Sequence, residues 1–339
     1  MNVKCVSAIG LFADLKHFYN PQKQTVQGGI NRMKRREFLH GIAAGALAAG
    51  GLPSLTRAST TASGALTVGD MTIQTLSDGN LLLPKGFLFP DLSDEQLDPI
   101  LSRHGITQDP LEPPLNITLL RHGDRVVLFD AGSGPAFQDS AGRLPLALEQ
   151  AGVTPDEITH VVFTHAHPDH LWGVLDDFDD PLFANAEHMM GQKEWDYWFD
   201  PETIDTIGDE RATMAAGAYR RMEILEDQIT RFNDGEEILP GVAARATHGH
   251  TPGHMSFELR SGSESVMVLG DAIGNHHVSF AQPSWHVGTD HDPDMAAGTR
   301  VGLLDQLAHD QIRVIGYHLP DGGLGQVVRA SDGYSFIPI

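Results

Sequence analysis

The sequence has very little cysteine and, beyond its first sixty residues, very little positive charge. Cys5 is the only cysteine in 339 residues, which excludes disulfide bonds within the chain and metal sites built from several thiolates. Residues 61–339 hold 43 acidic side chains against 15 basic ones, and only two of these are lysines, Lys85 and Lys193. Because nucleic acids are bound through clustered Lys and Arg, this acidic balance argues against a nucleic-acid partner.

Short repeats and low-complexity tracts are also missing, which excludes solenoids and coiled coils. The chain is 41% hydrophobic and 20% charged, and it is therefore too apolar for a disordered protein. From residue 66 onward, short apolar strands separated by Gly, Asp and Pro turns alternate with helical patterns. This alternation favours a layered α/β fold over residues 61–339. The expected strands are 66–76, 81–83 after a turn over 77–80, 116–121, 126–130, 159–164, 242–247, 255–259, 265–269 and 313–316. The expected helices are 144–151, 205–231 and 292–308.

Residues 1–60 differ in composition from the rest and are expected to be an N-terminal extension with a signal peptide. They contain eight basic and two acidic residues, and the pair Arg35-Arg36 precedes a Gly/Ala-rich run over 41–53. This run is too short to span a bilayer and is typical of a secretory signal. The paired arginines resemble a twin-arginine (Tat) signal. This predicts the Tat translocase as a partner and a periplasmic or secreted protein; the alternatives are a membrane anchor and a chance basic cluster.

Histidine is abundant, with 18 residues, and three of them share one short segment. His165, His167, Asp169 and His170 lie within six residues, directly after the expected strand 159–164. Imidazole nitrogens and carboxylate oxygens are the ligands that hold zinc and similar divalent ions. Two histidines one residue apart at a strand end can converge on one ion. Asp169 and His170 can face a second ion beside it.

Three later strands are also followed by residues of these types. His248, His250 and His254 follow the strand 242–247, Asp271 follows 265–269, and His318 follows 313–316. The ends of strands are where α/β folds gather their sites. A two-metal site assembled from several strand ends is therefore expected.

These motifs carry a resemblance. The chain resembles the metallo-β-lactamase superfamily of hydrolases over about residues 66–339. The motifs that it shares with that family are HxHxDH, then GHTPGH, a strand-terminal Gly-Asp and a late strand-terminal His. The resemblance implies a single-domain, four-layer αβ/βα sandwich with its metal site along one edge of two packed sheets. It also implies two divalent ions per chain, with Zn²⁺ expected. The implied ligands are His165, His167 and His250 for the first ion, Asp169, His170 and His318 for the second, and Asp271 for both.

In that family the first histidine of GHTPGH is the ligand, so His254 is expected to have a supporting role and His248 to line the site. Two neighbouring ions supply a bridging hydroxide near neutral pH, which attacks an electrophilic carbonyl or phosphoryl centre. Asp271 and Asp169 are the expected catalytic residues, and Asp169 would relay a proton to the leaving group. A Ser-His-Asp nucleophile is not required, and the sequence contains no G-x-S-x-G motif.

Four segments are similar to the methyl-parathion-hydrolase-like branch: THAHPDHLWG, HTPGHMSFEL, GDAIGNHHVSFAQPSW and GYHLPDGGLGQV. Members of that branch are exported dizinc-type hydrolases of lactones, aryl esters and some organophosphate triesters. The resemblance implies a small-molecule lactone or ester substrate, with acyl-homoserine lactones and aryl esters as candidates. The best-known lactonases have a catalytic tyrosine three residues after the bridging aspartate, where this chain has Gly274. His276, His277 or the metals alone would then orient the carbonyl.

Several alternatives stay open. The first is an enzyme whose main task is organophosphate triester hydrolysis. A β-lactamase is disfavoured, since true metallo-β-lactamases generally lack an aspartate at the position of Asp271. The remaining two are a mononuclear iron oxidoreductase on the same fold and a metal-stabilised binding protein without turnover.

Pocket residues are harder to predict, because most buried aromatic side chains belong to the core. Trp172, Phe280 and His276 are expected to line the substrate pocket, since they lie close in sequence to proposed ligands. Phe87 and Phe89 are expected at a pocket rim or a homodimer contact.

Overall fold

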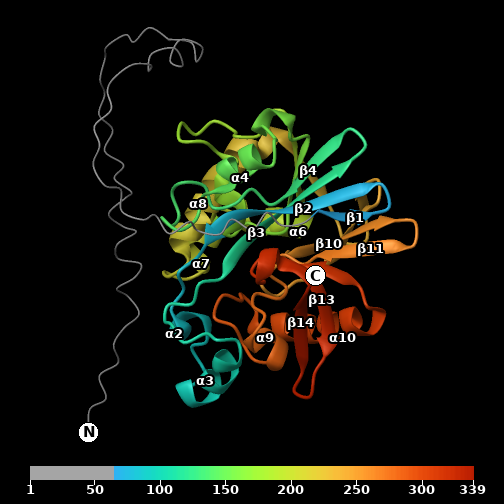
Figure 1. Ribbon diagram of the computed structural model, residues 1–339. Coiled ribbons are helices and arrows are strands. Elements are labelled where there is room, and N and C mark those ends of the chain that lie inside the picture. Colours follow the sequence, from blue (N-terminus) through green and yellow to red (C-terminus); the bar gives the residue numbers. More distant parts are fainter. Residues whose placement is uncertain (1–64) are drawn as a thin grey trace, which may run out of the picture. The chain divides into compact units, whose positions relative to one another are not determined.

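Two seven-stranded sheets pack face to face in the computed structural model, which describes residues 65–339 (Figure 1). The first sheet runs in the order β1-β2-β3-β4-β5-β6-β7, and the second in the order β14-β13-β12-β11-β10-β9-β8. The strands of the first sheet are β1 (Leu66–Val68), β2 (Met71–Asn80), β3 (Pro114–His122), β4 (Arg125–Phe129), β5 (His160–Phe163), β6 (Glu187–Gly191) and β7 (Ile229–Phe232). Those of the second are β8 (Glu237–Leu239), β9 (Val242–Ala246), β10 (Met255–Ser261), β11 (Glu264–Val268), β12 (Arg313–Ile315), β13 (Leu324–Arg329) and β14 (Tyr334–Pro338).

Helices cover the outer face of each sheet. The apolar sides of α4 and α8 pack on the first sheet, and α9 and α10 pack on the second. This arrangement confirms the predicted four-layer αβ/βα sandwich. The helices are α2 (Lys85–Leu88), α3 (Asp94–Arg103), α4 (Leu144–Gln150), α5 (Pro168–Leu171), α6 (Gln192–Trp198), α7 (Glu202–Thr206), α8 (Ala212–Leu225), α9 (Val278–Ala281) and α10 (Pro293–Asp310). Short 3₁₀ segments are η3 (Pro155–Glu157), η4 (Trp172–Val174), η5 (Glu226–Gln228) and η6 (Asp321–Gly323).

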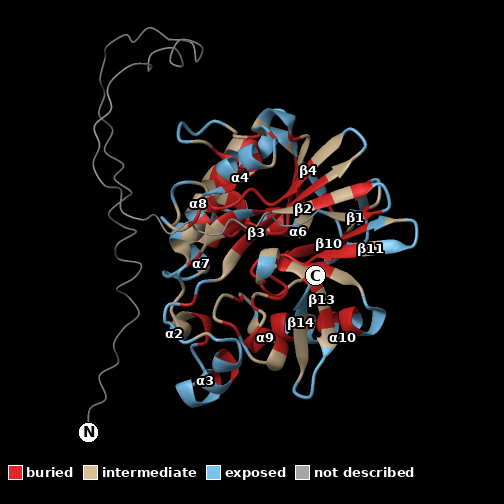
Figure 2. Ribbon diagram, in the orientation of Figure 1, coloured by how far each residue is buried: buried red, intermediate tan, exposed pale blue. Residues whose placement is uncertain are grey.

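The hydrophobic core between the sheets is built from one face of each sheet's central strands. Phe129 of β4 and Phe257 of β10 meet there, with their ring centroids 5.2 Å apart, and both side chains are fully buried. Figure 2 shows the same pattern, with buried strand segments inside and exposed helix faces and loops outside. Burying one such side chain contributes about 2 kcal/mol, so this layer holds the two sheets together and fixes their shared edge.

The parallel pairs decide where the strand ends meet. In the first sheet β4, β5, β6 and β7 run parallel to one another, and in the second β11 runs parallel to β12. The loops that follow β11 and β12 therefore leave from the same edge of the second sheet, and the loop that follows β5 leaves from the edge of the first sheet where β4, β6 and β7 also end. The carboxyl ends of parallel strands are where α/β proteins place functional loops.

The predicted helix over 205–231 is wrong. The structure has the short α7, then a turn in which Gly208 adopts φ 98°, then α8 ending at Leu225. A positive φ of this kind interrupts a helix, and glycine adopts it at low cost. The last part of the expected helix is strand β7, which pairs parallel with β6. Its Ile-Thr-Arg-Phe sequence is rich in residues that favour strands.

Two other boundaries also differ from expectation. The predicted strand 66–76 is a hairpin of β1 and β2, because Gly69 turns the chain at φ 56°. The expected turn over 77–80 is instead the bulged end of β2, and beyond it Leu83 makes only an isolated bridge to Leu111. The remaining expected strands and the helices 144–151 and 292–308 are confirmed to within two residues at each end.

Elements that were not foreseen include β6, β8, β13, β14, α2, α3, α6 and α9. Within the described residues, no helix combines the length and apolar character needed to cross a membrane. The predicted signal peptide and its arginine pair lie outside the described residues.

Candidate metal centre

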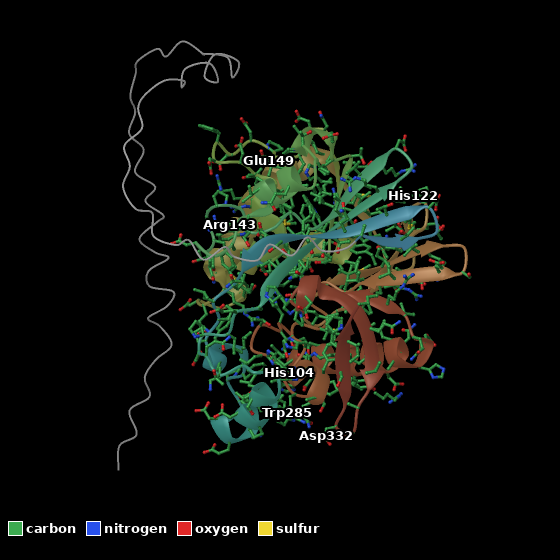
Figure 3. The ribbon with its side chains drawn as sticks, viewed as in Figure 1. His104, His122, Arg143, Glu149, Trp285 and Asp332 are labelled. Atoms are coloured by element: carbon green, nitrogen blue, oxygen red, sulfur yellow. The ribbon has the colours of Figure 1, made fainter. Side chains whose placement is uncertain are left out.

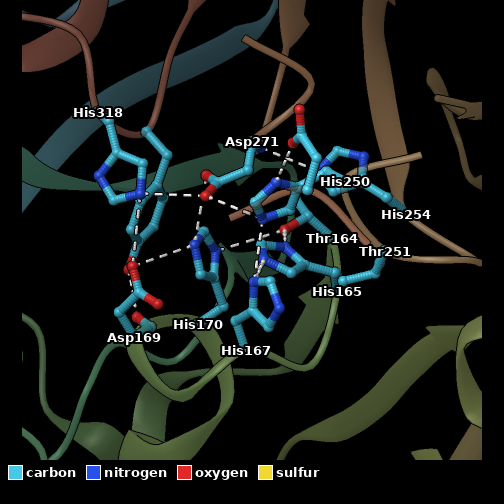
Figure 4. Close-up of polar contacts among 12 residues, drawn as sticks. Thr164, His165, His167, Asp169, His170, His250, Thr251, His254, Asp271 and His318 are labelled. Atoms are coloured by element: carbon cyan, nitrogen blue, oxygen red, sulfur yellow. Dashed lines mark hydrogen bonds and ion pairs between the residues drawn. The ribbon is translucent and has the colours of Figure 1, made fainter. Parts of the chain in front are cut away.

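Four loops at the shared edge of the sheets carry the predicted ligands (Figure 4). The loop after β5 leads into α5 and holds His165, His167, Asp169 and His170. The other three residues follow β9, β11 and β12: they are His250, Asp271 and His318. All seven residues are buried, with at most 8% of any one exposed. The structure therefore brings the whole predicted set into one cluster.

The first group consists of three imidazoles whose nitrogens converge. His165 Nε2 lies 3.0 Å from His167 Nδ1, and His250 Nε2 lies 2.9 Å from the same His167 nitrogen. Burial, and then the neighbouring imidazoles, hold the pKa values of His165 and His167 well below their ordinary value. Neutral rings present lone pairs, so these three nitrogens form a face suited to one metal ion.

The second group combines one carboxylate with two imidazoles. Asp169 Oδ2 lies 3.4 Å from His170 Nε2 and 3.4 Å from His318 Nε2. Burial opposes protonation of His170, but the carboxylates of Asp169, Asp271 and Asp130 outweigh it and raise the pKa of His170 well above its ordinary value. The carboxylates around the second group therefore favour a positive charge there.

Asp271 lies between the two groups. Its Oδ2 is 3.4 Å from His250 Nε2 and 3.1 Å from His318 Nε2, while its Oδ1 is 3.3 Å from His170 Nε2. Burial opposes ionisation of Asp271, but His318 and His170 outweigh it and hold its pKa well below the ordinary value. One ionised carboxylate thus faces both groups, as a shared ligand must.

Three buried atoms in this cluster lack a hydrogen-bond partner among the described residues: Asp169 Oδ2, His170 Nε2 and Asp271 Oδ1. Leaving a buried polar atom unpaired costs about 1–3 kcal/mol. These three atoms point into the same space, next to the converging imidazole nitrogens. The arrangement fits a site that binds metal cations. Asp169, His170 and His318 could hold one ion, His165, His167 and His250 another, and Asp271 could contact both.

The outer nitrogen of each of three ligand rings is held by an acceptor. Nδ1 of His170 donates to Asp130 Oδ2 at 2.8 Å, Nδ1 of His250 donates to Asp290 Oδ1 at 3.0 Å, and Nδ1 of His318 donates to the carbonyl of Pro114 at 2.9 Å. Each bond puts the ring proton on the outer nitrogen and leaves Nε2 free toward the cluster. Such partners orient metal-binding histidines and raise their basicity.

Glu194 of α6 joins the two histidine loops, and nothing in its sequence context predicted this. One carboxylate oxygen accepts from Ala166 N at 2.9 Å and from Trp198 Nε1 at 2.6 Å. The other accepts from Thr251 Oγ1 at 2.7 Å and Gly253 N at 3.0 Å. The side chain is fully buried. Asp130 and Asp290 were missed as well; for Asp130 the available signal was an acidic residue at a strand end.

His254 has the supporting position that was expected for it. Its Nε2 accepts from the backbone N–H of Asp271 at 2.9 Å, and its Nδ1 donates to Thr247 Oγ1 at 2.8 Å. His254 therefore fixes the loop that carries Asp271. His248 is half-buried, and its Nδ1 lies 3.2 Å from the carbonyl of His254 rather than in the cluster.

The structure places one of the expected pocket residues in the core and another, the half-buried Trp172, against it. Phe280 is 1% exposed and packs among the apolar residues under the second sheet, where its ring meets Phe336. The guanidinium carbon of Arg221 lies 4.4 Å from the ring centroid of Trp172, and the Trp172 ring also contacts Phe137. Closeness in sequence to a ligand does not decide to which side of a loop a neighbouring side chain points. The ring of Phe89 is also buried.

His276, the third expected pocket residue, contacts two other imidazoles. Its ring lies 4.8 Å from that of His104, which follows α3, and 5.2 Å from that of His277. Figure 3 labels His104 in this part of the molecule. Burial lowers the pKa of His276 to about 4. A role for His276 in binding substrate stays a prediction.

A cavity of about 320 Å³ lies near the first group, although none of the seven predicted ligands lines it. Tyr197, Arg211 and His291 are among its lining residues, and His291 Nε2 lies 3.1 Å from Nε2 of His167. This is room for a small organic molecule next to the imidazole cluster.

Comparison with known families decides what kind of protein has this geometry. Residues 112–307 match the metallo-beta-lactamase superfamily. The chain belongs to that superfamily. The match includes the loops that carry His165 to Asp271, whereas His318 lies beyond it.

Individual members of the superfamily are similar over most of the described domain. AidC, a dizinc quorum-quenching lactonase solved with a product bound, is 25% identical, with a TM-score of 0.77 over 81% of this chain and 97% of that chain. AbOPH, a hydrolase of the beta-lactamase superfamily, is 28% identical, with a TM-score of 0.76 over 81% of this chain and 96% of that chain. These relatives support a metal-dependent hydrolase.

Curated relatives match over shorter stretches or at lower identity. YobT, an uncharacterised protein of Bacillus subtilis, is 28% identical over 47% of this chain, and the chain spans 62% of its length. The N-acyl homoserine lactonase AiiB of Agrobacterium fabrum is 21% identical over 66% of this chain and 86% of its own length.

Proposed function

We propose that this chain is an exported dinuclear metallohydrolase that opens a lactone or cleaves an ester of a small molecule. The observation that carries the proposal is the position of Asp271, one ionised carboxylate within 3.4 Å of histidines from both groups. A site for a single ion would not need a second set of buried ligands on the far side of that carboxylate. Three of the similar proteins, AidC, AiiB and AbOPH, are lactonases or hydrolases.

The two ions, most simply zinc, would supply an activated water and polarise the carbonyl oxygen of the substrate. The protein's own contribution is position and proton transfer. Asp169 is fixed by the hydroxyl of Tyr317, which donates to its backbone carbonyl at 2.5 Å. Its Oδ2, buried and without a partner among the described residues, is the group we assign to passing a proton to the leaving oxygen.

A lactone or ester fits better than a β-lactam. The shared carboxylate Asp271 distinguishes this cluster from the β-lactamase pattern described above, and AidC is a lactonase with two zinc ions. Organophosphate triesters are the second candidate, supported by the four segments that resemble the methyl-parathion-hydrolase-like branch. Both substrate classes require the same attack at an electrophilic centre, so one enzyme can act on both at different rates.

Export through the Tat pathway is part of the proposal and rests on the sequence alone. The arginine pair at 35–36 and the short apolar run after it support translocation of a folded protein, which would carry out its reaction in the periplasm or outside the cell. Fusing residues 1–60 to a reporter that functions only when exported folded tests this point. Replacing both arginines by lysine should abolish export of the reporter.

The activity is tested by screening the zinc-loaded protein against acyl-homoserine lactones, aryl esters and a phosphotriester, comparing kcat/KM. We expect the highest value on a lactone or aryl ester, and loss of at least a thousandfold in kcat for Asp271→Ala. Unchanged turnover in Asp271→Ala would overturn the two-metal mechanism. Absence of turnover on every substrate would favour the binding protein instead, and one bound iron per chain would favour an oxidoreductase.

A further inference from the structure

His291 approaches the metal cluster from outside, and neither the sequence motifs nor the family resemblance assigned it a role. Its Nε2 lies 3.1 Å from Nε2 of His167, on the opposite side of that ring from the nitrogen that faces His165 and His250. Its Nδ1 lies 3.4 Å from the hydroxyl of Tyr197. His291 therefore lies between a proposed ligand and a tyrosine in the wall of the 320 Å³ cavity.

The segment that carries His291 is tied to the loop of His250. The backbone N–H of His291 donates to the carbonyl of His250 at 3.0 Å, and that of Asp292 donates to the carbonyl of Gly249 at 3.0 Å. The preceding residue, Asp290, accepts from Nδ1 of His250 at 3.0 Å. Two adjacent residues thus support two of the three imidazoles in the first group.

This segment is itself held firmly. Arg300 of α10 donates to Asp290 Oδ2 at 2.8 Å, and Arg211 donates to the carbonyls of Gly288 and Asp290 at 2.8 and 3.2 Å. The ring of His291 also packs edge-on against Trp198 at 5.5 Å. An imidazole fixed in this way can impose an orientation on its neighbour.

The proton arrangement follows from the geometry. His167 must keep a lone pair on Nδ1 to face the cluster, so the proton of its neutral ring is on Nε2 and is donated to His291. His291 then accepts on Nε2 and donates from Nδ1 toward Tyr197.

We propose that His291 is a positioning residue that fixes the tautomer and orientation of His167 for metal binding, with Tyr197 as the next link toward the cavity. The inference rests on the metal centre proposed above. The outer partners of metal-binding histidines typically change metal affinity by about 10–100-fold when they are removed. His291 supplies this support with an imidazole, whereas the three supported rings described above use a carboxylate or a carbonyl.

The test measures zinc binding by competition with a chromophoric chelator, in the full protein and in three variants. We expect His291→Ala to weaken the binding of one zinc ion about 10–100-fold and to leave the other unchanged. His291→Gln retains an acceptor for the His167 proton and should recover most of the affinity. Tyr197→Phe should lose less than His291→Ala, because its contact is longer.

The control is His286→Ala, a histidine in the same loop region whose side chain is 44% exposed and pairs with exposed Asp294. Its zinc affinity should equal that of the parent. The melting temperature of each zinc-free protein separates positioning from folding: we expect His291→Ala to match the control.

Equal zinc affinity in His291→Ala and the parent would overturn the inference alone. A zinc-free melting temperature lowered together with affinity, without rescue by Gln, would make His291 merely structural. A parent that binds no zinc would overturn the proposed function itself.

Discussion

Asp130 Oδ2 lies 2.8 Å from Nδ1 of His170, and this contact decides which ring nitrogen of His170 faces the second group. The carboxylate also accepts from the backbone N–H and the hydroxyl of Thr164 at 2.7 and 2.8 Å. Asp130 stands directly after β4 with φ 69°, a left-handed conformation that Asp and Asn adopt more readily than other side chains with a Cβ. One residue therefore links the end of β4, the loop after β5 and a proposed metal ligand.

The variant Asp130→Asn separates the charge of this residue from its backbone conformation. Asparagine tolerates the same φ, but its amide nitrogen cannot accept. At the Oδ2 position the amide leaves both the Thr164 hydroxyl and His170 Nδ1 without an acceptor, and at the Oδ1 position it leaves the Thr164 backbone N–H without one. We expect the affinity for one zinc ion to fall about 10–100-fold, measured by chelator competition. Asp124→Asn in the exposed turn between β3 and β4 is the control and should bind both ions as the parent does. Equal zinc binding in the two variants would contradict this role of Asp130.

Glu194→Gln should destabilise the fold as well as the site. All four groups around this carboxylate are donors, so an amide NH₂ meets donors on one side and leaves buried groups unpaired. We expect the free energy of unfolding to fall by about 2–4 kcal/mol, measured by denaturant titration. The matched variant Glu149→Gln changes an exposed side chain of α4 (Figure 3) and should stay within about 0.5 kcal/mol of the parent. Equal stabilities for the two variants would refute the joining role of Glu194.

The site residues that could be predicted from the sequence are those that lie in local motifs. His165, His167, Asp169 and His170 could be predicted together because a buried β-branched run ends directly before them. Their supports come from elsewhere in the chain: Glu194 bonds to the backbone of Ala166, 28 residues earlier, and Asp130 bonds to His170, 40 residues later. Such pairs follow from how the loops pack and not from any spacing in the sequence.

Errors in the fold had a similar cause. The helix over 205–231 was expected because the helical pattern of apolar residues continues across Gly208. Only the pairing of Ile229 to Phe232 with β6 shows that the end of this range is a strand. The pocket role expected for Phe280 rested on distance along the chain, while its direction was decided by the apolar residues of α10 and β13 around it. Tertiary packing outweighed local preference in both cases.

His188 of β6 is a buried imidazole that costs stability. It is fully buried, neither ring nitrogen has a hydrogen-bond partner within residues 65–339, and its ring stacks on Phe163. Burial lowers its pKa from 6.5 to about 4. Between these values the unfolded chain binds the proton and the folded chain does not. The contribution of His188 to the free energy of unfolding is therefore highest above pH 6.5 and falls by about 1.4 kcal/mol per pH unit until about pH 4.

The variant His188→Leu removes this titration with a side chain of similar volume. We expect it to be more stable than the parent at pH 7, by about 1 kcal/mol, and to gain further on the parent as the pH falls from 6.5 to 4. Urea titrations at several pH values measure both effects. The exposed histidine His309, changed to Gln, is the control and should keep the parent's pH dependence. An unchanged slope in His188→Leu would show that His188 is not the titrating group.

Removing metal should lower the stability of the folded chain, because the cluster concentrates buried carboxylates and unpaired atoms that only a cation can satisfy together. Ligand binding to the folded state alone stabilises it by about 2.7 kcal/mol at one hundred times the dissociation constant. We expect the melting temperature to fall on chelation and to recover with added zinc. In Asp271→Asn the difference between chelated and zinc-loaded protein should shrink, since the variant loses the carboxylate charge facing both groups. A melting temperature that changes with neither chelator nor zinc would mean that these seven side chains bind no metal and contribute only to the fold.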